Sequence, residues 1–207
     1  MFEKHIEAYY NFLTKQLLTE KFSVVKRNRK TINLFAFGDL KWILLPEQLD
    51  EIKEEDIEDY IKKEPQVIRF IDKTDFEDIK NKELCRKLTV EDKELFEEFH
   101  NSCSNQDKEE GMVSLDDPVV YGCIVDNKIV SVTSLWHWGD RLSDIGILSH
   151  PEYRHRGYAK SVCQTMMSDI DRLFIWRCDY DNAGSNKLAL SIGFIEMGES
   201  YILEKVK

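Results

Sequence analysis

Cysteine pairing motifs are absent from this sequence. Its five cysteines stand at positions 85, 103, 123, 163 and 178, so they form no C-x-x-C pair and are odd in number. Three of them fall within apolar patterns expected for strands or a helix. Such cysteines are typical of reduced core residues rather than of a disulfide framework or a thiolate metal site. We therefore expect a cytoplasmic protein.

Long apolar runs are missing as well. No run approaches the roughly 18 residues expected of a membrane-spanning helix. The first residues, MFEKHIEAYYNFL, lack the apolar segment of a signal peptide. We expect neither secretion nor association with a membrane.

An excess of positive charge is also lacking. The chain has 29 Lys and Arg against 39 Asp and Glu, which gives a net charge of −10. Nucleic-acid binding proteins neutralise phosphates with basic residues, so this balance argues against a nucleic-acid partner. Against this acidic background, Arg154, His155, Arg156 and Lys160 form a local basic cluster. Such a cluster is a place where a polyanionic ligand can dock.

Several other functional signatures do not occur. The chain contains neither G-x-x-x-x-G-K-[ST] nor G-x-G-x-x-G, which excludes a P-loop and a dinucleotide fold by their glycines. His137 lies between two tryptophans with no partner at metal-ligand spacing, so we expect a core or pocket-wall residue and no metal site. Arg177 does not make Cys178 a nucleophile, because neighbouring strand residues face opposite ways.

The most informative segment runs from Asp144 to Ile170 and predicts a strand, a loop and a helix. Its helix has six apolar residues on one face, namely Ala159, Val162, Cys163, Met166, Met167 and Ile170. The first N–H groups of a helix have no intrahelical acceptor and lie at the positive end of the helix dipole. Gly157 allows a ligand to approach the backbone there. The pattern predicts an anion site, since an ordinary basic helix start would place cations unfavourably.

A known family carries the same pattern. Arg154-x-x-Gly157-x-Ala159 resembles the R/Q-x-x-G-x-G/A coenzyme A signature of the GCN5-related N-acetyltransferases, or GNAT enzymes. The family's later features follow in order: an apolar strand at 173–178, Asn182 opening a short helix, and Gly193-Phe194 closing it. By this resemblance the chain is identified as a member of the GNAT superfamily.

The resemblance implies acetyl-CoA or CoA as the cofactor, with its pyrophosphate on the backbone amides from His155 to Ala159. It places the backbone of residues 147–149 beside the thioester carbonyl and the pantetheine arm, and Asn182 near the cofactor. The expected cofactor residues are Ile147, Leu148, Ser149, Arg154, His155, Arg156, Gly157, Tyr158, Ala159, Lys160 and Asn182.

The implied activity is transfer of an acetyl group to a primary amine by direct attack. The acceptor, a small molecule or a peptide, is not identified. The alternative is a non-catalytic acyl-CoA-binding sensor or structural module with a GNAT fold. The oligomeric state stays open.

Acetyl transfer requires a base, an oxyanion site and a proton donor. An alkyl ammonium with a pKa near ~10 must lose a proton before it attacks. Asp144 is the only carboxylate within its predicted strand and is our candidate base, directly or through water; the alternative is an aspartate that ends a turn. The family's usual tyrosine is replaced by Ala189, so the general acid is unassigned. Tyr180 is a candidate, with a surface tyrosine or protonation by solvent as alternatives.

We predict an α/β (α+β) fold in which residues 83–207 form a GNAT-like domain with a mixed, mostly antiparallel sheet between helices. The strands at 144–149 and 173–178 should be parallel and splayed at their ends. The remaining predictions for this section are a strand at 84–88, a helix capped at Thr89, a polar loop at 101–111, a hairpin of 119–125 with 129–138, and a terminal hairpin of 194–197 with 201–206 around Gly198.

Residues 1–82 form an N-terminal α/β extension without an assignable motif. Its predicted elements are helices at 5–18 and 47–63, strands at 22–25 and 67–71, and a hairpin of 32–37 with 40–45 around Gly38-Asp39. The extension is interpreted as a degenerate half of the same fold, or alternatively as a lid or dimerisation module. Its hairpin is too apolar to stand alone, so we expect one rigid unit with the acceptor pocket near the junction.

Overall fold

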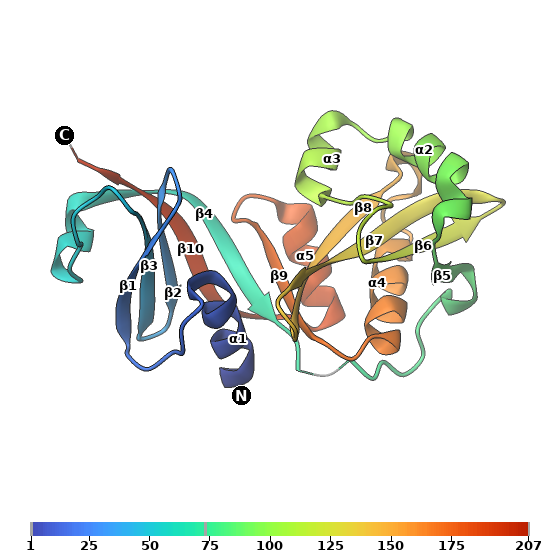
Figure 1. Cartoon of the computed structure of the whole chain (residues 1–207). Helices are drawn as coiled ribbons and strands as arrows, with labels where there is room; N and C mark the ends of the chain where they lie inside the picture. Colours follow the sequence, from blue (N-terminus) through green and yellow to red (C-terminus); the bar gives the residue numbers. More distant parts are fainter. Residues whose placement is uncertain (1, 73, 207) are drawn as a thin grey trace.

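The computed structural model describes residues 2–72 and 74–206. A single ten-stranded sheet runs through the molecule in the order β1-β3-β2-β10-β4-β9-β8-β7-β6-β5 (Figure 1). The strands are β1 (Phe22–Arg27), β2 (Ile32–Phe37), β3 (Leu40–Pro46), β4 (Tyr60–Phe70), β5 (Cys85–Lys87), β6 (Val119–Val125), β7 (Lys128–Trp138), β8 (Leu142–Ser149), β9 (Leu173–Asp179) and β10 (Ile195–Lys205). The helices are α1 (Glu3–Thr14), α2 (Lys93–Ser102), α3 (Asn105–Gly111), α4 (Tyr158–Asp169) and α5 (Ala183–Ile192).

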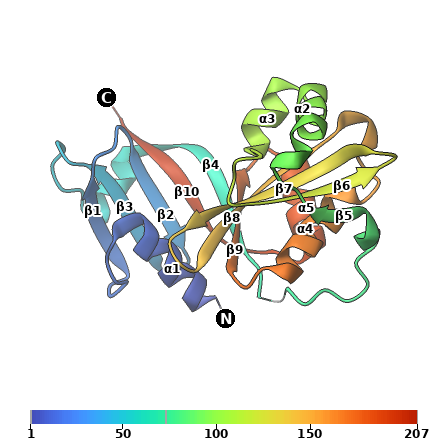
Figure 2. The same ribbon diagram turned by 45° about the vertical axis from the view of Figure 1, so that its right-hand side comes forward.

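The sheet is mixed and mostly antiparallel, as predicted. Among the strands of the described residues, only the β1–β3 and β8–β9 pairs are parallel. Helices α4 and α5 cover one face of the C-terminal part, where Val162 and Met166 pack on Tyr121 and Trp176. Helices α2 and α3 lie over the other face, with Phe96 of α2 in a separate apolar cluster (Figure 2).

Two of the three predicted hairpins form, and they have the expected turn chemistry. The β2–β3 turn contains Gly38 at φ 57°, and the β6–β7 turn contains Asp126 and Asn127 at φ 47° and 60°. Two consecutive positive φ values are those of a type I′ turn, whose twist matches that of paired strands. The capping box at Thr89 is also present, with Asp92 as its second member.

Strands β8 and β9 part soon after they meet. They pair in parallel only where Leu142–Asp144 lies beside Leu173–Ile175. Beyond this point β8 continues to Ser149 and β9 to Asp179 without further pairing to each other. The predicted splayed parallel pair is therefore confirmed, and the gap that it opens positions the site described below.

The helix predicted at 47–63 is wrong. A short 3-10 helix at Glu55–Asp59 is followed directly by β4, which pairs with β10 from Tyr60 to Phe70. Ile52 and Ile57 are buried, whereas Leu49 is 40% exposed, so the segment offers the core too few anchors for an amphipathic helix. Pairing with a distant strand prevails over the local helical spacing.

The terminal hairpin around Gly198 is also wrong. Strand β10 runs without a turn from Ile195 to Lys205, between β2 and β4. A Cβ atom on Gly198 would lie 2.5 Å from the Ala36 carbonyl oxygen and from the Phe37 ring. This glycine therefore allows two strands to approach closely and does not form a turn.

The polar segment 101–111 is not simply a loop, because residues from Asn105 to Gly111 form α3. Ser104 caps this helix by accepting a hydrogen bond from the Asp107 amide at 3.1 Å.

The N-terminal section shares the sheet with the rest of the chain. Strand β10, from the C-terminus, pairs with both β2 and β4, and β4 pairs with β9. Helix α1 packs on the same sheet, where Tyr9 is fully buried against Trp42 and Trp138. The boundary at residue 82 and the interpretation of the extension as half a GNAT unit stay predictions.

Candidate active site

Two cavities meet at the gap between β8 and β9. The first has a volume of about 620 Å³ and the second about 660 Å³. Glu110, Gly111 and Asn182 line both of them, so a group bound in one cavity can reach a group bound in the other. We call them the cofactor cavity and the acceptor cavity, after the roles that the sequence predicts for their residues.

The cofactor cavity collects most of the residues expected at the cofactor. All but Arg156 line it, namely Ile147, Leu148, Ser149, Arg154, His155, Gly157, Tyr158, Ala159, Lys160 and Asn182. Arg156 instead donates to the Glu152 carbonyl at 3.1 Å and lies over the Tyr153 ring. The structure places these residues around one cavity. That they bind the cofactor stays a prediction.

The N-terminus of α4 opens into the cofactor cavity. Its first helical bond runs from Ser161 to the Gly157 carbonyl at 3.0 Å. Within residues 2–72 and 74–206, no acceptor lies within hydrogen-bond distance of the Tyr158, Ala159 and Lys160 amides. Gly157 has φ 88°, and a Cβ built on it meets no atom within 4 Å. These free amides beside open space fit a phosphate group.

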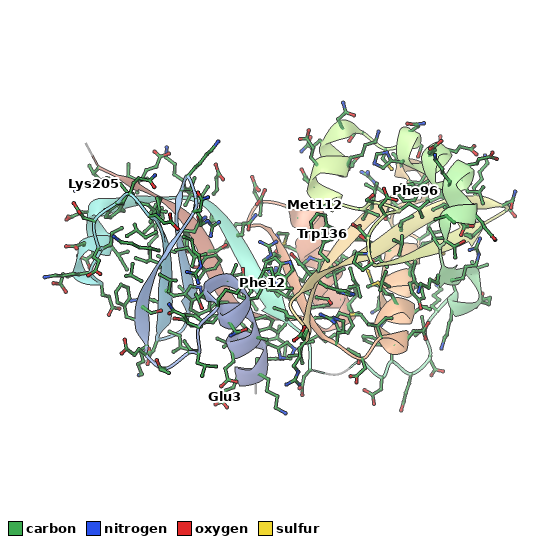
Figure 3. The ribbon with its side chains drawn as sticks, in the orientation of Figure 1. Glu3, Phe12, Phe96, Met112, Trp136 and Lys205 are labelled. Atoms are coloured by element: carbon green, nitrogen blue, oxygen red, sulfur yellow. The ribbon has the colours of Figure 1, made fainter. Side chains whose placement is uncertain are left out.

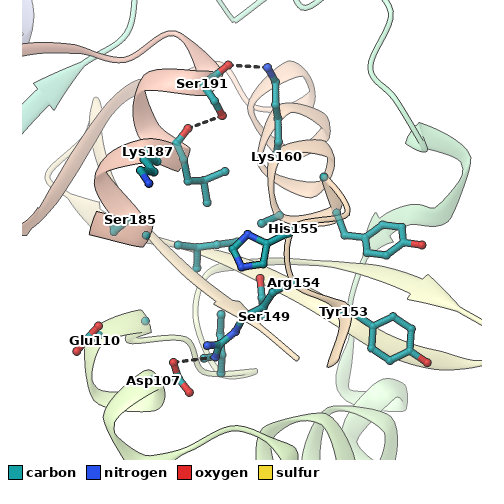
Figure 4. A pocket seen from close by; sticks show the side chains of 18 of the residues that line it. Asp107, Glu110, Ser149, Tyr153, Arg154, His155, Lys160, Ser185, Lys187 and Ser191 are labelled. Atoms are coloured by element: carbon teal, nitrogen blue, oxygen red, sulfur yellow. Dashed lines mark hydrogen bonds and ion pairs between the residues drawn. The ribbon is translucent and has the colours of Figure 1, made fainter. Parts of the chain in front are cut away.

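Two basic side chains are fixed at the rim of the same cavity (Figure 4). Arg154 forms an ion pair of 2.8 Å with Asp107 of α3, and Lys160 donates to the Ser191 carbonyl at 2.5 Å. Burial raises the pKa of Asp107, but the hydrogen bonds from Ser104 and Arg154 have a larger, opposite effect. The pKa of Asp107 is therefore lowered overall. The ion pair therefore connects the α4 loop to α3 across the cavity.

Helix α3 reaches β8 through two glycines that sequence reasoning did not select. A Cβ on Gly111 would lie 2.6 Å from the Ile147 carbonyl oxygen, and one on Gly146 would lie 2.8 Å from the Gly111 oxygen. Only glycine at both positions allows the end of α3 to lie this close to the strand. The single available signal was a glycine inside a strand pattern, which often marks close backbone approach.

The acceptor cavity lies where the N-terminal section meets the rest of the sheet. Phe12 comes from α1 and Trp136 from β7 (Figure 3). Gln66 of β4 and Trp138 of β7 line the same cavity. Met112, at the end of α3, completes the apolar wall. The sequence predicted an acceptor pocket near this junction, and a cavity lies there. That the cavity binds the acceptor stays a prediction.

Asp144, the predicted base, lines the acceptor cavity and is paired with Arg177. Its Oδ2 atom accepts hydrogen bonds from Nε and Nη2 of Arg177 at 3.0 and 2.6 Å. The two side chains are 14% and 25% exposed. Burial raises the pKa of Asp144, and Arg177 offsets this rise only in part. Burial lowers the pKa of Arg177, but Asp144 and Tyr9 together raise it more, so the guanidinium stays charged.

The two candidate positions for a proton donor lie away from the cavities. Tyr180 is 65% exposed and lines neither cavity. Ala189 belongs to α5 and is fully buried in the core. The structure therefore brings Asp144 to the site but leaves Tyr180 outside it.

Metal-binding clusters and membrane-spanning helices are both absent from the part of the chain that the structure describes. Within residues 2–72 and 74–206, no group of three or more His, Cys, Asp or Glu side chains could hold a metal ion. In the same ranges, no helix is long and apolar enough to cross a membrane.

Similar structures support the fold. An acetyltransferase of the GNAT family from Colwellia psychrerythraea has a TM-score of 0.51 at 14% identity, with 70% of this chain and 57% of that chain covered. A protein of the GNAT family from Novosphingobium aromaticivorans has a TM-score of 0.50 at 17% identity, covering 72% and 69%. A functionally unknown conserved protein from Staphylococcus epidermidis has a TM-score of 0.50 at 18% identity, covering 79% and 71%.

Sequence comparisons identify the family. No curated protein matches the chain. The family model described as GNAT acetyltransferase matches residues 40–203, which is well over half of the chain. The match includes β4, most of β10 and the residues that line the two cavities, apart from Phe12. The chain belongs to the GNAT acetyltransferase family.

Proposed function

We propose that this protein is an N-acetyltransferase that moves the acetyl group of acetyl-CoA to a primary amine. The observation that carries the proposal is the meeting of two cavities at the gap between β8 and β9. One contains a helix N-terminus with free amides, and the other contains a buried carboxylate. The family membership supports an acyltransferase, and the five free cysteines agree with a reducing compartment such as the cytoplasm.

In this proposal the cofactor cavity holds the CoA part of the donor. The amides of Tyr158, Ala159 and Lys160 receive the pyrophosphate, with Gly157 leaving room for it. The exposed edge of β8 at 147–149 lies beside the pantetheine arm, and Asn182 stands where the two cavities meet. Acetyl-CoA supplies an acetyl thioester that an amine can attack.

The acceptor cavity prepares the amine. Asp144, directly or through water, accepts the proton that the ammonium must lose, and Arg177 holds the carboxylate in place. The amine nitrogen then forms its bond to the carbonyl carbon as the carbon–sulfur bond breaks. Because Ala189 carries no polar group and Tyr180 is remote, solvent protonates the departing thiolate.

Thiol release with a panel of primary amines tests this function. CoA production that requires the added amine supports the enzyme. A second function, a non-catalytic acyl-CoA-binding module, is favoured by Ala189 at the family's usual tyrosine position. Tight CoA binding without turnover of any amine would establish that second function instead.

Gly157→Val tests the cofactor site, with Gly38→Val as the matched control. Both glycines have positive φ and no atom within 4 Å of a built Cβ, so valine is strained to a similar degree at both. Only Gly157 lines the cofactor cavity. Calorimetry should show weaker CoA binding for Gly157→Val alone. Equal CoA affinity in the two variants would contradict the proposed phosphate position.

A further inference from the structure

We propose that the acceptor cavity selects a small amine that carries at least two positive charges and no carboxylate. This inference rests on the proposed acetyl transfer and names the substrate class of that same reaction. It is carried by the charge of the cavity wall, by one exposed indole ring and by the size of the space.

The wall of the acceptor cavity is strongly acidic. It contains one guanidinium, that of Arg177, and four carboxylates, so its formal net charge is 1 − 4 = −3. The carboxylates are those of Glu109, Glu110, Asp144 and Asp179. Asp144 and Arg177 neutralise each other. The remaining charge of −3 therefore lies on the carboxylates of α3 and of the end of β9.

Two of these carboxylates, those of Glu110 and Asp179, accept hydrogen bonds from neutral amide groups. Glu110 accepts hydrogen bonds from Gln106 at 2.8 Å and from Asn182 at 2.7 Å. Asp179 accepts one from Gln66 at 3.0 Å. Amide donors orient a carboxylate without cancelling its charge, so the wall keeps its attraction for a cation and repels an acceptor that carries a carboxylate.

Trp136 offers a second, independent contact for a cation. Its side chain is 48% exposed in the cavity, and it lies opposite Asp144 in the β7–β8 pair. The neighbouring Trp138 ring is already occupied, with Phe12 stacked at 4.9 Å and the Arg177 guanidinium at 4.4 Å. Among the described residues no aromatic ring or cation lies on Trp136, so its indole face is open to an ammonium group.

The cavity has the dimensions of a site for a small molecule. Its 660 Å³ lie between α1, α3 and the sheet, within the usual range for such sites. The reacting nitrogen must reach Gly111 and Asn182, where the cofactor cavity begins. A second ammonium group several bonds away then remains beside the acidic and aromatic wall.

Three five-carbon amines test the inference with the purified full-length protein. Cadaverine carries two ammonium groups, pentylamine carries one, and 5-aminopentanoate carries one ammonium and one carboxylate. With acetyl-CoA as donor, kcat/KM for cadaverine should exceed that for pentylamine about tenfold, with 5-aminopentanoate lowest. The advantage of cadaverine should shrink as salt is added, because the acidic side chains are exposed.

Variants locate the selection in the cavity. Glu109→Gln combined with Asp179→Asn should reduce the preference for cadaverine over pentylamine about threefold to tenfold, and Trp136→Leu about twofold to fivefold. Glu47→Gln removes an exposed carboxylate outside both cavities and should leave the preference unchanged.

Equal kcat/KM values for cadaverine and pentylamine, or a preference for 5-aminopentanoate, would overturn the inference while leaving acetyl transfer intact. Turnover of a lysine-rich peptide without turnover of cadaverine would also overturn the inference. If no amine is acetylated, the proposed function fails, and calorimetric titration of the CoA-loaded protein still decides the inference. Cadaverine should then bind more tightly than pentylamine, and equal binding would reject the selection.

Discussion

Asp144 and Arg177 form a two-point ion pair across the strands that part at the active site. Asp144 is the last residue of β8 that pairs with β9. Arg177 lies on β9, beyond the part of that strand that pairs with β8. The guanidinium also lies 4.4 Å from the Trp138 ring, which stacks on Tyr9 of α1 at 5.1 Å. The pair therefore connects the splayed strands to the helix of the N-terminal section.

Loss of Arg177 should destabilise the protein strongly. Arg177→Leu leaves the Asp144 carboxylate, which is only 14% exposed, without its cation. Urea denaturation should show a loss of about 2–4 kcal/mol in the free energy of unfolding, because an unpaired buried charge is costly. The double variant Arg177→Leu, Asp144→Asn should recover part of that loss. A double variant no more stable than the single one would mean that the pair is not coupled.

Asp144→Asn should separate the chemistry from cofactor binding. Asparagine keeps the shape of the side chain but cannot accept a proton from an ammonium group. Amine-dependent turnover should fall at least about 100-fold, which is the usual minimum for loss of a general base. CoA affinity, measured by calorimetry, should stay unchanged because Asp144 does not line the cofactor cavity. Turnover within about threefold of the parent protein would assign the proton to water.

Gly146→Ala should displace α3 from β8. The added methyl group would lie 2.8 Å from the Gly111 oxygen and 3.0 Å from the Met112 oxygen. Backbone atoms cannot rotate away, so we expect a loss of about 1–3 kcal/mol in unfolding free energy and a marked loss of turnover.

Gly184→Ala is the matched control for that substitution. Its Cβ would meet a single atom at 3.7 Å, an ordinary contact, and the residue lies in the first turn of α5. This variant should be as stable as the parent protein or slightly more stable, because alanine favours a helix. Equal unfolding midpoints for the two variants would argue against a tight α3–β8 contact.

Asp92 should give a pH-dependent contribution to stability. Hydrogen bonds from Arg86 lower the pKa of Asp92 below its ordinary 3.8, despite the opposing effect of burial. A carboxyl group with a lowered pKa in the folded state stabilises the protein above its unfolded pKa, and this contribution disappears as the pH falls through the folded pKa.

Asp92→Asn should therefore cost about 1 kcal/mol at neutral pH, a modest value because Arg86 is half exposed and screened by solvent. The difference from the parent protein should vanish in acid, below the lowered pKa. Urea denaturation across this pH range measures it, and Glu94→Gln, an exposed carboxylate of α2, is the control. A difference that stays constant with pH would contradict the ion pair.

Residues 83–207 should not form a working enzyme by themselves. Without the first 82 residues, β10 loses both of its neighbours, β2 and β4, and β9 loses β4. Phe12 and Gln66 also disappear from the acceptor cavity. Expression of this fragment should give a poorly soluble protein, or one that binds CoA without acetylating an amine. Full amine-dependent turnover by the fragment would exclude the N-terminal section from the acceptor site.

Features that depend on local chemistry can be predicted from the sequence alone. The hairpin at Gly38 follows from turn preference, and α4 follows from the spacing of its apolar residues. The glycine and charge around Gly157 indicated an anion site, and the strand–helix–strand order required β8 and β9 to be parallel. Each of these depends on residues close together in the chain, so a single sequence is sufficient to predict it.

Features that depend on distant partners are visible only once the chain is folded. The segment after Glu47 and the strand through Gly198 were predicted wrongly, because β4 and β10 pair with each other across more than a hundred residues. The partners of Asp144 and Glu110, and the close approach of Gly111 to Gly146, likewise join separate elements. Periodicity describes which face of an element is apolar, but it does not specify which other element covers that face. The acceptor cavity is made of such contacts between α1, α3, β7 and β9, and for that reason it became visible only in the fold.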